Sequence, residues 1–195
     1  MATIDRHRRS IRLRGWDYTA AAAYSVTIVT HERDMLFGEI VGGEVVLSTF
    51  GHVAAEEWAR TAAVRANVEL DEFVVMPNHI HGIVWVTSRP PDAALPADVG
   101  ARHRLDEGAR HRLAPTGGGR GISVAAGSLG AVIAGYKSAV ARRINDLRGT
   151  PGEPVWQRNY YERIVRNERE LAAIRLYILE NPRNWEVDCE NRPVG

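Results

Sequence analysis

The sequence predicts an α+β fold in which an antiparallel β-sheet carries helices packed on one face. Short runs of β-branched residues are bounded by turn signals, and longer segments with the helical apolar period lie between these runs. The expected order is strand, hairpin, helix, strand, strand, helix, strand, helix. This order favours the α+β class, and the nearest simple architecture is a ferredoxin-like (RRM-like) split βαβ sandwich.

The first part of the chain is predicted to form a strand, a hairpin and a helix. Residues 24–29, YSVTIV, are rich in β-branched side chains and predict a strand. Residues 37–47 contain two short β runs around Gly42 and Gly43, which is a hairpin signal. Residues 51–68 predict a helix. The inner positions of this helix are Val53, Trp58, Ala62 and Val64.

Two strands and an insertion follow. Strands are predicted at 72–76 and 80–87, with a break at Pro77 and Asn78. Residues 88–127 are rich in Pro, Gly, Ala and Arg, show no sustained period and contain the near-repeat ARHRL. Such a segment predicts a long, flexible, basic insertion.

The last part of the chain is predicted to form two helices with a short strand between them. Ser128 can cap the first helix, whose apolar stripe has helical spacing. The stripe consists of Leu129, Val132, Ile133, Tyr136, Val140 and Ile144. A short strand is predicted at 161–165. The final helix starts at Glu168, because Asn167 and the glutamate three residues later have capping-box spacing, and Pro182 ends it.

These elements divide the chain into a basic N-terminal arm (1–22), one domain with its insertion (23–187) and a C-terminal tail (188–195). The net charge of +1 hides an uneven distribution, since residues 6–14 contain arginines and no acid. Clustered arginines suit a phosphate backbone. A solvated basic surface explains the same pattern, and the charge alone leaves both readings open.

Composition also bears on the compartment. The chain has one cysteine, Cys189, so no internal disulfide can form, which fits a reducing cytoplasm. No apolar run reaches the about 18 residues of a transmembrane helix, and the basic N-terminal segment lacks the apolar region of a secretory signal. We therefore expect a cytoplasmic protein without a membrane partner.

Two histidines lie one residue apart in a predicted strand, in the stretch FVVMPNHIHGIVWV. Side chains alternate between the faces of a strand, so His79 and His81 point the same way, about 7 Å apart along it. Two imidazoles in this arrangement can converge on one divalent metal ion. The alternative, which the pair by itself favours, is two unrelated histidines that are hydrogen-bonded or at the surface.

The final helix adds a second pair of polar groups. Tyr177 and Asn181 are four residues apart, so they share one helical face. A tyrosine can act as a nucleophile, and the amide oxygen of an asparagine is a hard metal ligand. The alternative for Tyr177 is a core aromatic residue, because the apolar positions of this helix predict a buried side.

With these residues identified, the chain resembles the REP-associated tyrosine transposases, relatives of the single-tyrosine HUH transposases of small insertion sequences. The resemblance covers nearly all of the chain outside the insertion, in the family's order. It is carried by RRSIRLRGWDY, LFGEIVGGEVVLSTFG, VVMPNHIHGIVWV, SLGAVIAGYKSAVARRIN and VWQRNYYERIVRNERELAAIRLYILENPRNW. The histidine pair alone is a weak signal, whereas the stretches together are specific.

The resemblance implies an HUH endonuclease domain with a defined set of site residues. His79 and His81 would be metal ligands, Tyr177 the catalytic nucleophile and Asn181 the third ligand, with Mg²⁺ or Mn²⁺ as the metal. The other candidates for the nucleophile are Tyr136, Tyr160 and Tyr161.

The resemblance also implies a substrate, a repetitive extragenic palindrome folded as a hairpin with a single-stranded guide sequence beside it. The expected DNA-binding residues are Arg8, Arg9, Arg12, Arg14, Lys137, Arg142 and Arg143. Trp16 or Trp156 would stack on exposed bases.

We therefore expect a transposase-like endonuclease and strand transferase for single-stranded DNA, associated with the nucleoid, that works through a 5′-phosphotyrosine. One alternative is a non-catalytic, domesticated protein that binds hairpin nucleic acid. Another is a hydrolytic metalloenzyme acting on small phosphates. The sequence leaves open whether the protein is a monomer or a homodimer.

Overall fold

The structure is a computed structural model that describes residues 16–87 and 125–191. A four-stranded antiparallel sheet has the order β4-β5-β1-β6. Its strands are β1 (Ala22–Val29), β4 (Val68–Val75), β5 (His79–Val86) and β6 (Tyr161–Val165). The helices are α1 (Thr49–Ala63), α2 (Leu129–Arg148) and α3 (Glu168–Glu180). The βαββαβ succession through α1 and α2, together with this strand order, confirms the ferredoxin-like expectation.

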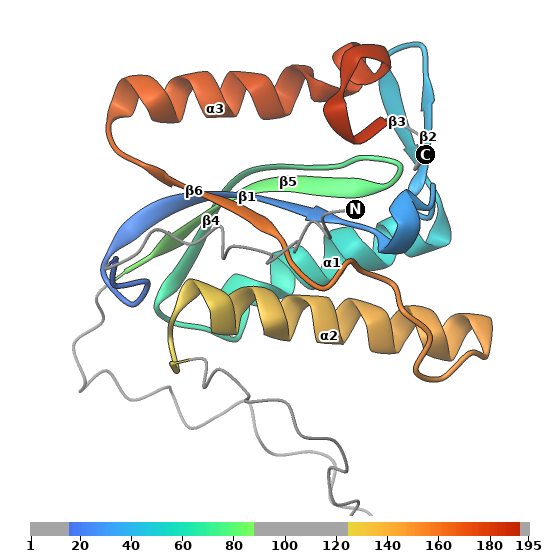
Figure 1. Cartoon of the computed structure of the whole chain (residues 1–195), viewed down its shortest axis with the longest axis horizontal. Coiled ribbons are helices and arrows are strands. Elements are labelled where there is room, and N and C mark those ends of the chain that lie inside the picture. The colour runs from blue at the N-terminus through green and yellow to red at the C-terminus, as the bar shows by residue number, and fades with distance from the viewer. Residues whose placement is uncertain (1–15, 88–124, 192–195) are drawn as a thin grey trace, which may run out of the picture.

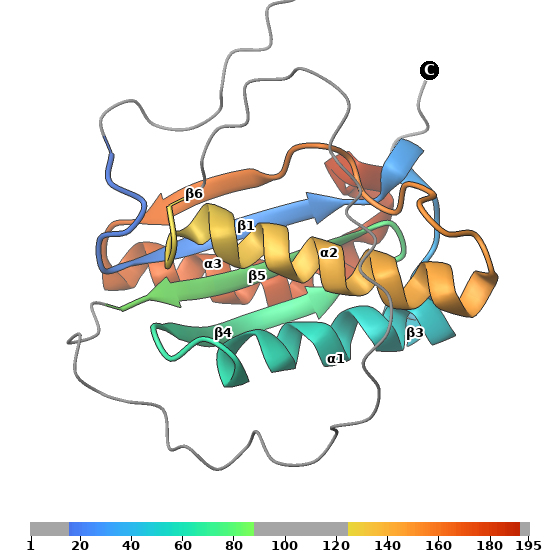
Figure 2. The same ribbon diagram turned by 90° about the horizontal axis from the view of Figure 1, so that it is seen from below.

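The helices form two layers around the sheet. Helices α1 and α2 lie side by side on one face, and α3 lies on the opposite face (Figures 1 and 2). The expectation of helices on one face therefore holds for α1 and α2, and α3 adds a second layer. The reason lies in β5, which is buried along nearly its whole length. A strand with both faces buried needs a layer on each side.

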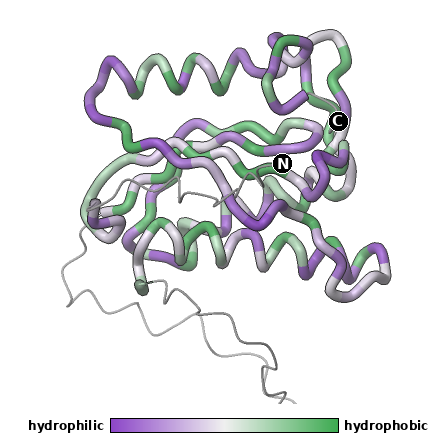
Figure 3. The backbone as a smooth tube through the Cα atoms, in the orientation of Figure 1, coloured by the Kyte–Doolittle hydropathy of each residue, from purple (hydrophilic) through white to green (hydrophobic). Residues whose placement is uncertain are grey.

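The two faces of β5 belong to separate cores. Ile80 and Val84 point into the larger core under α1 and α2, whereas Ile83 packs with Leu171 and Ile178 of α3. Figure 3 shows the hydrophobic residues recurring at intervals along the helices, as this amphipathic packing requires. The alternation of side chains that the sequence predicted for this strand is confirmed.

Two of the predicted elements differ in detail. The helix predicted over 51–68 ends at Ala63, because Val68 begins β4 and pairs with Val86 of β5. Val64 fits the helical period but is exposed. The predicted hairpin forms as β2 (Gly38–Val41) and β3 (Glu44–Leu47), but it is a separate two-stranded sheet.

The caps of the helices follow the sequence. The side chains of Ser48, Ser128 and Asn167 accept hydrogen bonds from backbone N–H groups in the first turns of α1, α2 and α3. Helix α3 starts at Glu168 and is followed by 3₁₀ turns at Asn181–Val187 and Cys189–Asn191. These turns carry the chain back over the end of β5, and this return shapes the candidate site.

The basic arm up to residue 15, with its arginines, and residues 88–124 of the predicted insertion lie outside the described residues. Within the segments that the structure does describe, no helix is long and apolar enough to cross a membrane.

Gly82 of β5 is required by the packing of Trp58. The Trp58 ring stacks on Phe73 at 5.1 Å and meets Tyr136 edge-on at 5.3 Å, and a Cβ at Gly82 would overlap its ring carbons. We expect Gly82→Ala to lower the free energy of unfolding by about 1–3 kcal/mol, measured by guanidinium denaturation.

Gly135→Ala on α2 is the matched control for this prediction. A Cβ at Gly135 would meet only the mobile end of the Arg65 side chain, and alanine favours the helix by up to about 1 kcal/mol. Equal unfolding midpoints for Gly82→Ala and Gly135→Ala would show that the Trp58 packing does not constrain residue 82.

Candidate active site

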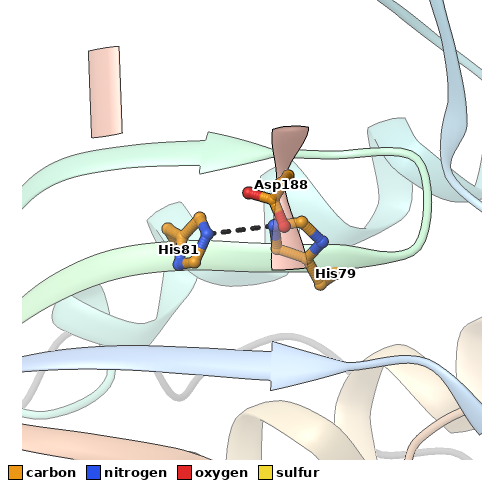
Figure 4. Close-up of side chains that lie close together, drawn as sticks. All are labelled: His79, His81 and Asp188. Carbon is orange, nitrogen blue, oxygen red and sulfur yellow. Dashed lines mark hydrogen bonds between the residues drawn. The ribbon is translucent and has the colours of Figure 1, made fainter. Parts of the chain in front are cut away.

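His79 and His81 meet on the face of the sheet that α3 covers. Both side chains are buried, with 0% and 5% of the residue surface exposed. Their Nε2 atoms are 3.0 Å apart, and the ring centroids are separated by 4.5 Å (Figure 4). The structure thus brings together the two imidazoles that the strand period placed on one face.

Each of these histidines is oriented by a hydrogen bond at its other ring nitrogen. His79 Nδ1 lies 2.8 Å from Asn78 Oδ1, and His81 Nδ1 lies 2.8 Å from Thr27 Oγ1 on β1. The Asn78 amide is itself fixed, because its Nδ2 donates to the carbonyl of Glu190 at 2.9 Å. Its oxygen must therefore accept from His79 Nδ1–H, which leaves the lone pair of His79 Nε2 pointing toward His81.

Burial keeps both rings neutral. It lowers the pKa of His79 to about 2, and the positive charges that His81 and Arg33 can carry act in the same direction. Burial also lowers the pKa of His81 to about 4, against the opposing effect of the Asp188 carboxylate. Neutral imidazole is the form that binds a metal ion.

Asp188 completes the group from the far end of the chain. Its carboxylate lies close to both histidine rings. The possible ligand atoms of His79, His81 and Asp188 are all within 4.8 Å of one another (Figure 4). Asp188 is buried. Its Oδ1 accepts from the backbone N–H of Glu190 at 2.6 Å, and its Oδ2 accepts from Asn181 Nδ2 at 2.9 Å.

Asn181 contributes an amide oxygen that has no hydrogen-bond partner. Asn181 is 1% exposed, and its Oδ1 is a buried acceptor without a donor among the described residues. An unpaired buried acceptor costs about 1–3 kcal/mol, so this position calls for a cation or a donor.

The donor set fits a divalent metal ion. Two imidazole nitrogens and a carboxylate form a mixed nitrogen and oxygen set that divalent ions accept, and the unpaired amide oxygen of Asn181, whose Nδ2 donates to Asp188, is the candidate for a further ligand. A separation of about 3 Å also suits two nitrogens that bind one ion at neighbouring positions.

Tyr177 stands over His81 on the exposed side of this group. Its hydroxyl lies 3.4 Å from His81 Nε2, and the two rings meet edge-on at 5.2 Å. The residue is 49% exposed. Partial burial raises the pKa of Tyr177 to about 12, and the negative charges of Asp188 and Glu190 contribute to this rise. A hydrogen bond with Asn181 acts in the opposite direction. The phenol is therefore protonated at neutral pH unless a positive charge enters the site.

The other candidate tyrosines lie elsewhere. Tyr136 belongs to α2 on the opposite face, is 1% exposed and donates its hydroxyl to the carbonyl of Ala54. Tyr160 packs against the larger core. Tyr161 lies on β6 and is 51% exposed. Tyr177 is the candidate that lies against the histidine pair.

An ion pair holds α3 on the sheet two residues before Tyr177. Arg175 donates from Nε and Nη2 to the two carboxylate oxygens of Asp71 at 2.8 and 2.6 Å, and Trp85 Nε1 donates to Asp71 Oδ2 at 3.0 Å. Asp71 occupies the irregularity in β4 between Leu70 and Phe73. The hydrogen bonds from Arg175 hold the pKa of Asp71 at about 2, below its ordinary 3.8.

We expect Asp71→Asn to lower the free energy of unfolding by about 1–2 kcal/mol at neutral pH, a value that allows for solvent screening of the Arg175 pair. Because the folded pKa is the lower one, the carboxylate stabilises the fold above about pH 3.8 and loses this effect as the pH falls toward 2. The difference between wild type and Asp71→Asn should therefore shrink between these pH values.

Denaturant titrations at several pH values measure this difference. Asp146→Asn, at an exposed position of α2, removes the same charge and is the control. A difference that stays constant down to pH 2 would contradict the assignment.

The predicted basic residues of α2 are not brought to the histidine pair. Lys137 Nζ donates to the carbonyls of Gln157 and Arg158 at 2.6 and 3.2 Å, and burial lowers its pKa to about 8. Arg143 pairs with Glu56 and Glu57. Arg142 is exposed. All three belong to the helix layer opposite α3, and contact with DNA stays a prediction for them.

The two tryptophans proposed for stacking differ in exposure. Trp156 is 8% exposed and packs against Phe37 at 5.1 Å, so it is a core residue and cannot stack on a base. This corrects the expectation for Trp156. Trp16 is 38% exposed, and its Nε1 donates to the hydroxyl of Tyr24.

Sequence reasoning missed Asp188, Asn78 and Thr27. Thr27 had a usable signal, because YSVTIV alternates polar and apolar residues and places Thr27 on one face with Ser25. Asp188 had no such signal in the sequence, since it lies in an irregular segment that we predicted as the C-terminal tail (188–195). The described part of that tail is packed, because Asp188 is buried and Arg33 pairs with Glu190.

Comparison with known proteins gives a relative in sequence and two in structure. No protein-family model matches the chain. The chain is 31% identical over 185 residues to an uncharacterized protein of Haemophilus influenzae, and the alignment covers 93% of this chain and 92% of that protein.

Among solved structures, the chain is similar to a REP-associated tyrosine transposase bound to a REP hairpin. The identity is 15% and the TM-score 0.45, with 83% of this chain and 66% of that chain covered. It is also similar to a proposed transposase of Deinococcus radiodurans, with 17% identity, a TM-score of 0.42 and coverage of 86% and 95%.

Proposed function

We propose that this chain is a metal-dependent endonuclease and strand transferase that acts on hairpin DNA with a single-stranded flank. The chain belongs to the same protein family as the Haemophilus influenzae protein, and its motifs resemble those of REP-associated tyrosine transposases. The reaction would proceed through a 5′-phosphotyrosine at Tyr177. The observation that carries this proposal is the half-exposed phenol of Tyr177 standing 3.4 Å from His81 Nε2, above a buried His79–His81–Asp188 group.

Each residue of the site has a physical task in this proposal. His79, His81 and Asp188 would hold the metal ion, with the unpaired oxygen of Asn181 as a further ligand. When bound, a divalent ion such as Mg²⁺ or Mn²⁺ neutralises phosphate oxygens and favours the phenolate. Asn78 and Thr27 orient the imidazoles, so that no rotation of the rings is needed on binding.

Tyr177 performs the covalent step. Its Oη attacks the phosphorus, the bond between phosphorus and the 3′-oxygen breaks, and the phenol proton leaves to solvent while a proton from solvent reaches the leaving 3′-oxygen. The new ester keeps the phosphodiester energy, so a 3′-OH can later reverse the step without ATP. Because Tyr177 is half-exposed, a strand bound beside α3 can present a phosphate to it.

A denaturing gel tests this proposal. A labelled hairpin oligonucleotide, taken with its single-stranded flank from repeats beside the gene, is incubated with the protein and Mg²⁺ or Mn²⁺. We expect a covalent protein–DNA band that EDTA suppresses, and proteolysis followed by mass spectrometry should place the DNA on the peptide containing Tyr177. Binding without a covalent band under either metal would instead favour a non-catalytic hairpin-binding protein, and turnover of small phosphates without a band would favour a hydrolase.

A further inference from the structure

The face of the sheet that carries the histidine pair is only partly covered by α3. The helix starts directly after β6, packs Leu171 near Ala23 and then crosses toward β4, where Arg175 meets Asp71. This course leaves the beginning of β6, at Tyr161, beyond the cover of the helix.

Tyr161 lies in the same cross-strand row of the sheet as His81. The pairing register places Tyr161 of β6 opposite Thr27 of β1, and Thr27 opposite His81 of β5. Residues directly opposite in an antiparallel sheet point to the same face, and the hydrogen bond between Thr27 and His81 shows which face this is. Two strand spacings separate Tyr161 from His81, about 10 Å between the backbones.

Small polar side chains lie between the tyrosine and the site. Along β1 these are Thr27 and Ser25, both hydroxyl residues of low bulk, and both half-buried. Tyr161 itself is 51% exposed. A flat aromatic ring therefore stands beside the site with no large side chain of the β1 strand between them.

The neighbouring residue on this face carries positive charge. Arg163 lies two residues along β6, opposite Ser25, so it shares the face of Tyr161. Its side chain is 71% exposed, and Nη2 pairs with Glu170 Oε1 at 2.5 Å. An exposed ring next to an exposed guanidinium matches the chemistry of a single nucleic-acid strand, which offers a base to the ring and a phosphate to the cation.

The geometry points to Tyr161 as a stacking platform for the nucleobase next to the scissile phosphate, an inference that rests on the proposed function. With the phosphate at Tyr177 and the histidine pair, the flanking nucleotide reaches across Thr27, and its base lies on the Tyr161 ring. The platform would hold the strand in position for Tyr177 and prefer an unpaired nucleotide, because a base inside a duplex has no free face for the ring.

Equilibrium binding of oligonucleotides with single abasic sites tests the platform. The probe is the labelled hairpin with its single-stranded flank, and an abasic site replaces each flank nucleotide in turn. We expect Tyr161→Ala to bind the intact probe about 5- to 100-fold more weakly than wild type, the range measured for loss of one base stack. Tyr161→Phe should bind as wild type does, because it keeps the ring.

The abasic series separates stacking from a general weakening. In wild type, one abasic position should cause a similar loss, and in Tyr161→Ala the same position should cause no further loss. A 5-iodouracil at that position should crosslink to the peptide containing Tyr161. Leu147→Ala, at an exposed apolar residue of α2 on the opposite layer, is the matched control and should bind normally.

Two outcomes would overturn the inference: unchanged binding by Tyr161→Ala, or equal further losses at every abasic position. Adduct formation by wild type is measured in the same samples. An adduct without any effect of Tyr161→Ala would reject the platform and keep the proposed function. Position-specific binding that depends on Tyr161 without an adduct would keep the platform and reject the catalytic proposal.

Discussion

Tyr177→Phe is expected to lower the yield of covalent protein–DNA adduct by at least about 10³-fold, because it removes the oxygen that we propose forms the bond to phosphorus. The phenylalanine ring keeps the edge-on contact with His81. The lost hydroxyl has a long contact of 3.4 Å to His81 Nε2 and a hydrogen bond with Asn181, and the residue is half-exposed. The free energy of unfolding should therefore stay within about 1 kcal/mol of wild type.

The measurement for Tyr177→Phe combines a denaturing gel with equilibrium binding of the same hairpin probe. Binding should change by less than about 3-fold, which separates loss of the nucleophile from loss of the substrate. Tyr160→Phe is the matched control, since it removes a hydroxyl from a tyrosine on the opposite core and should keep the adduct. An undiminished adduct in Tyr177→Phe would show that another residue attacks.

Loss of a proposed metal ligand is the second large effect that we expect. His81→Ala should weaken Mn²⁺ binding by at least about 100-fold, because orienting partners of a ligand alone contribute about 10- to 100-fold. Isothermal titration calorimetry of the protein with Mn²⁺ measures this without any turnover. His52→Ala, at an exposed histidine of α1, is the control and should leave the affinity unchanged.

The same titration distinguishes the contributions of Asp188 and Asn181 to Mn²⁺ affinity. Asp188→Asn keeps an oxygen that can accept from Asn181 Nδ2 but removes the charge, and we expect Mn²⁺ affinity to fall about 10- to 100-fold. Asn181→Ala removes an amide oxygen that is neutral, so its effect should be smaller. Equal Mn²⁺ affinities for His81→Ala and His52→Ala would contradict a metal site at the histidine pair.

Local periodicity was enough to predict much of the candidate site. The alternation of a strand placed His79 and His81 on one face, and the structure has their Nε2 atoms 3.0 Å apart. The four-residue spacing of a helix placed Tyr177 and Asn181 on one side of α3. The first relation holds within one strand and the second across the last turn of α3 and its C-cap, where backbone geometry alone sets which side chains are neighbours.

The rest of the site depends on contacts between distant elements. Nothing in the local pattern shows that α3 packs opposite α1 and α2, because an apolar stripe fits either face of a sheet whose central strand is buried on both. The pair between Asp71 and Arg175 helps to settle the position of α3, and it joins residues 104 apart. Asp188 reaches the histidines only because the 3₁₀ turns after α3 fold back over β5.

The sequence by itself therefore determined the α+β class and the starts of α2 and α3, and it predicted the two pairs of candidate site residues, since each follows from period, capping or turn chemistry in a short stretch of chain. Only the tertiary structure decided that Tyr177 stands over His81, that Asp188 joins the ligand group and that Trp156 belongs to the core. The physical reason is that these contacts are selected by burial and by charge pairing between segments far apart in the chain, and no local pattern contains that information.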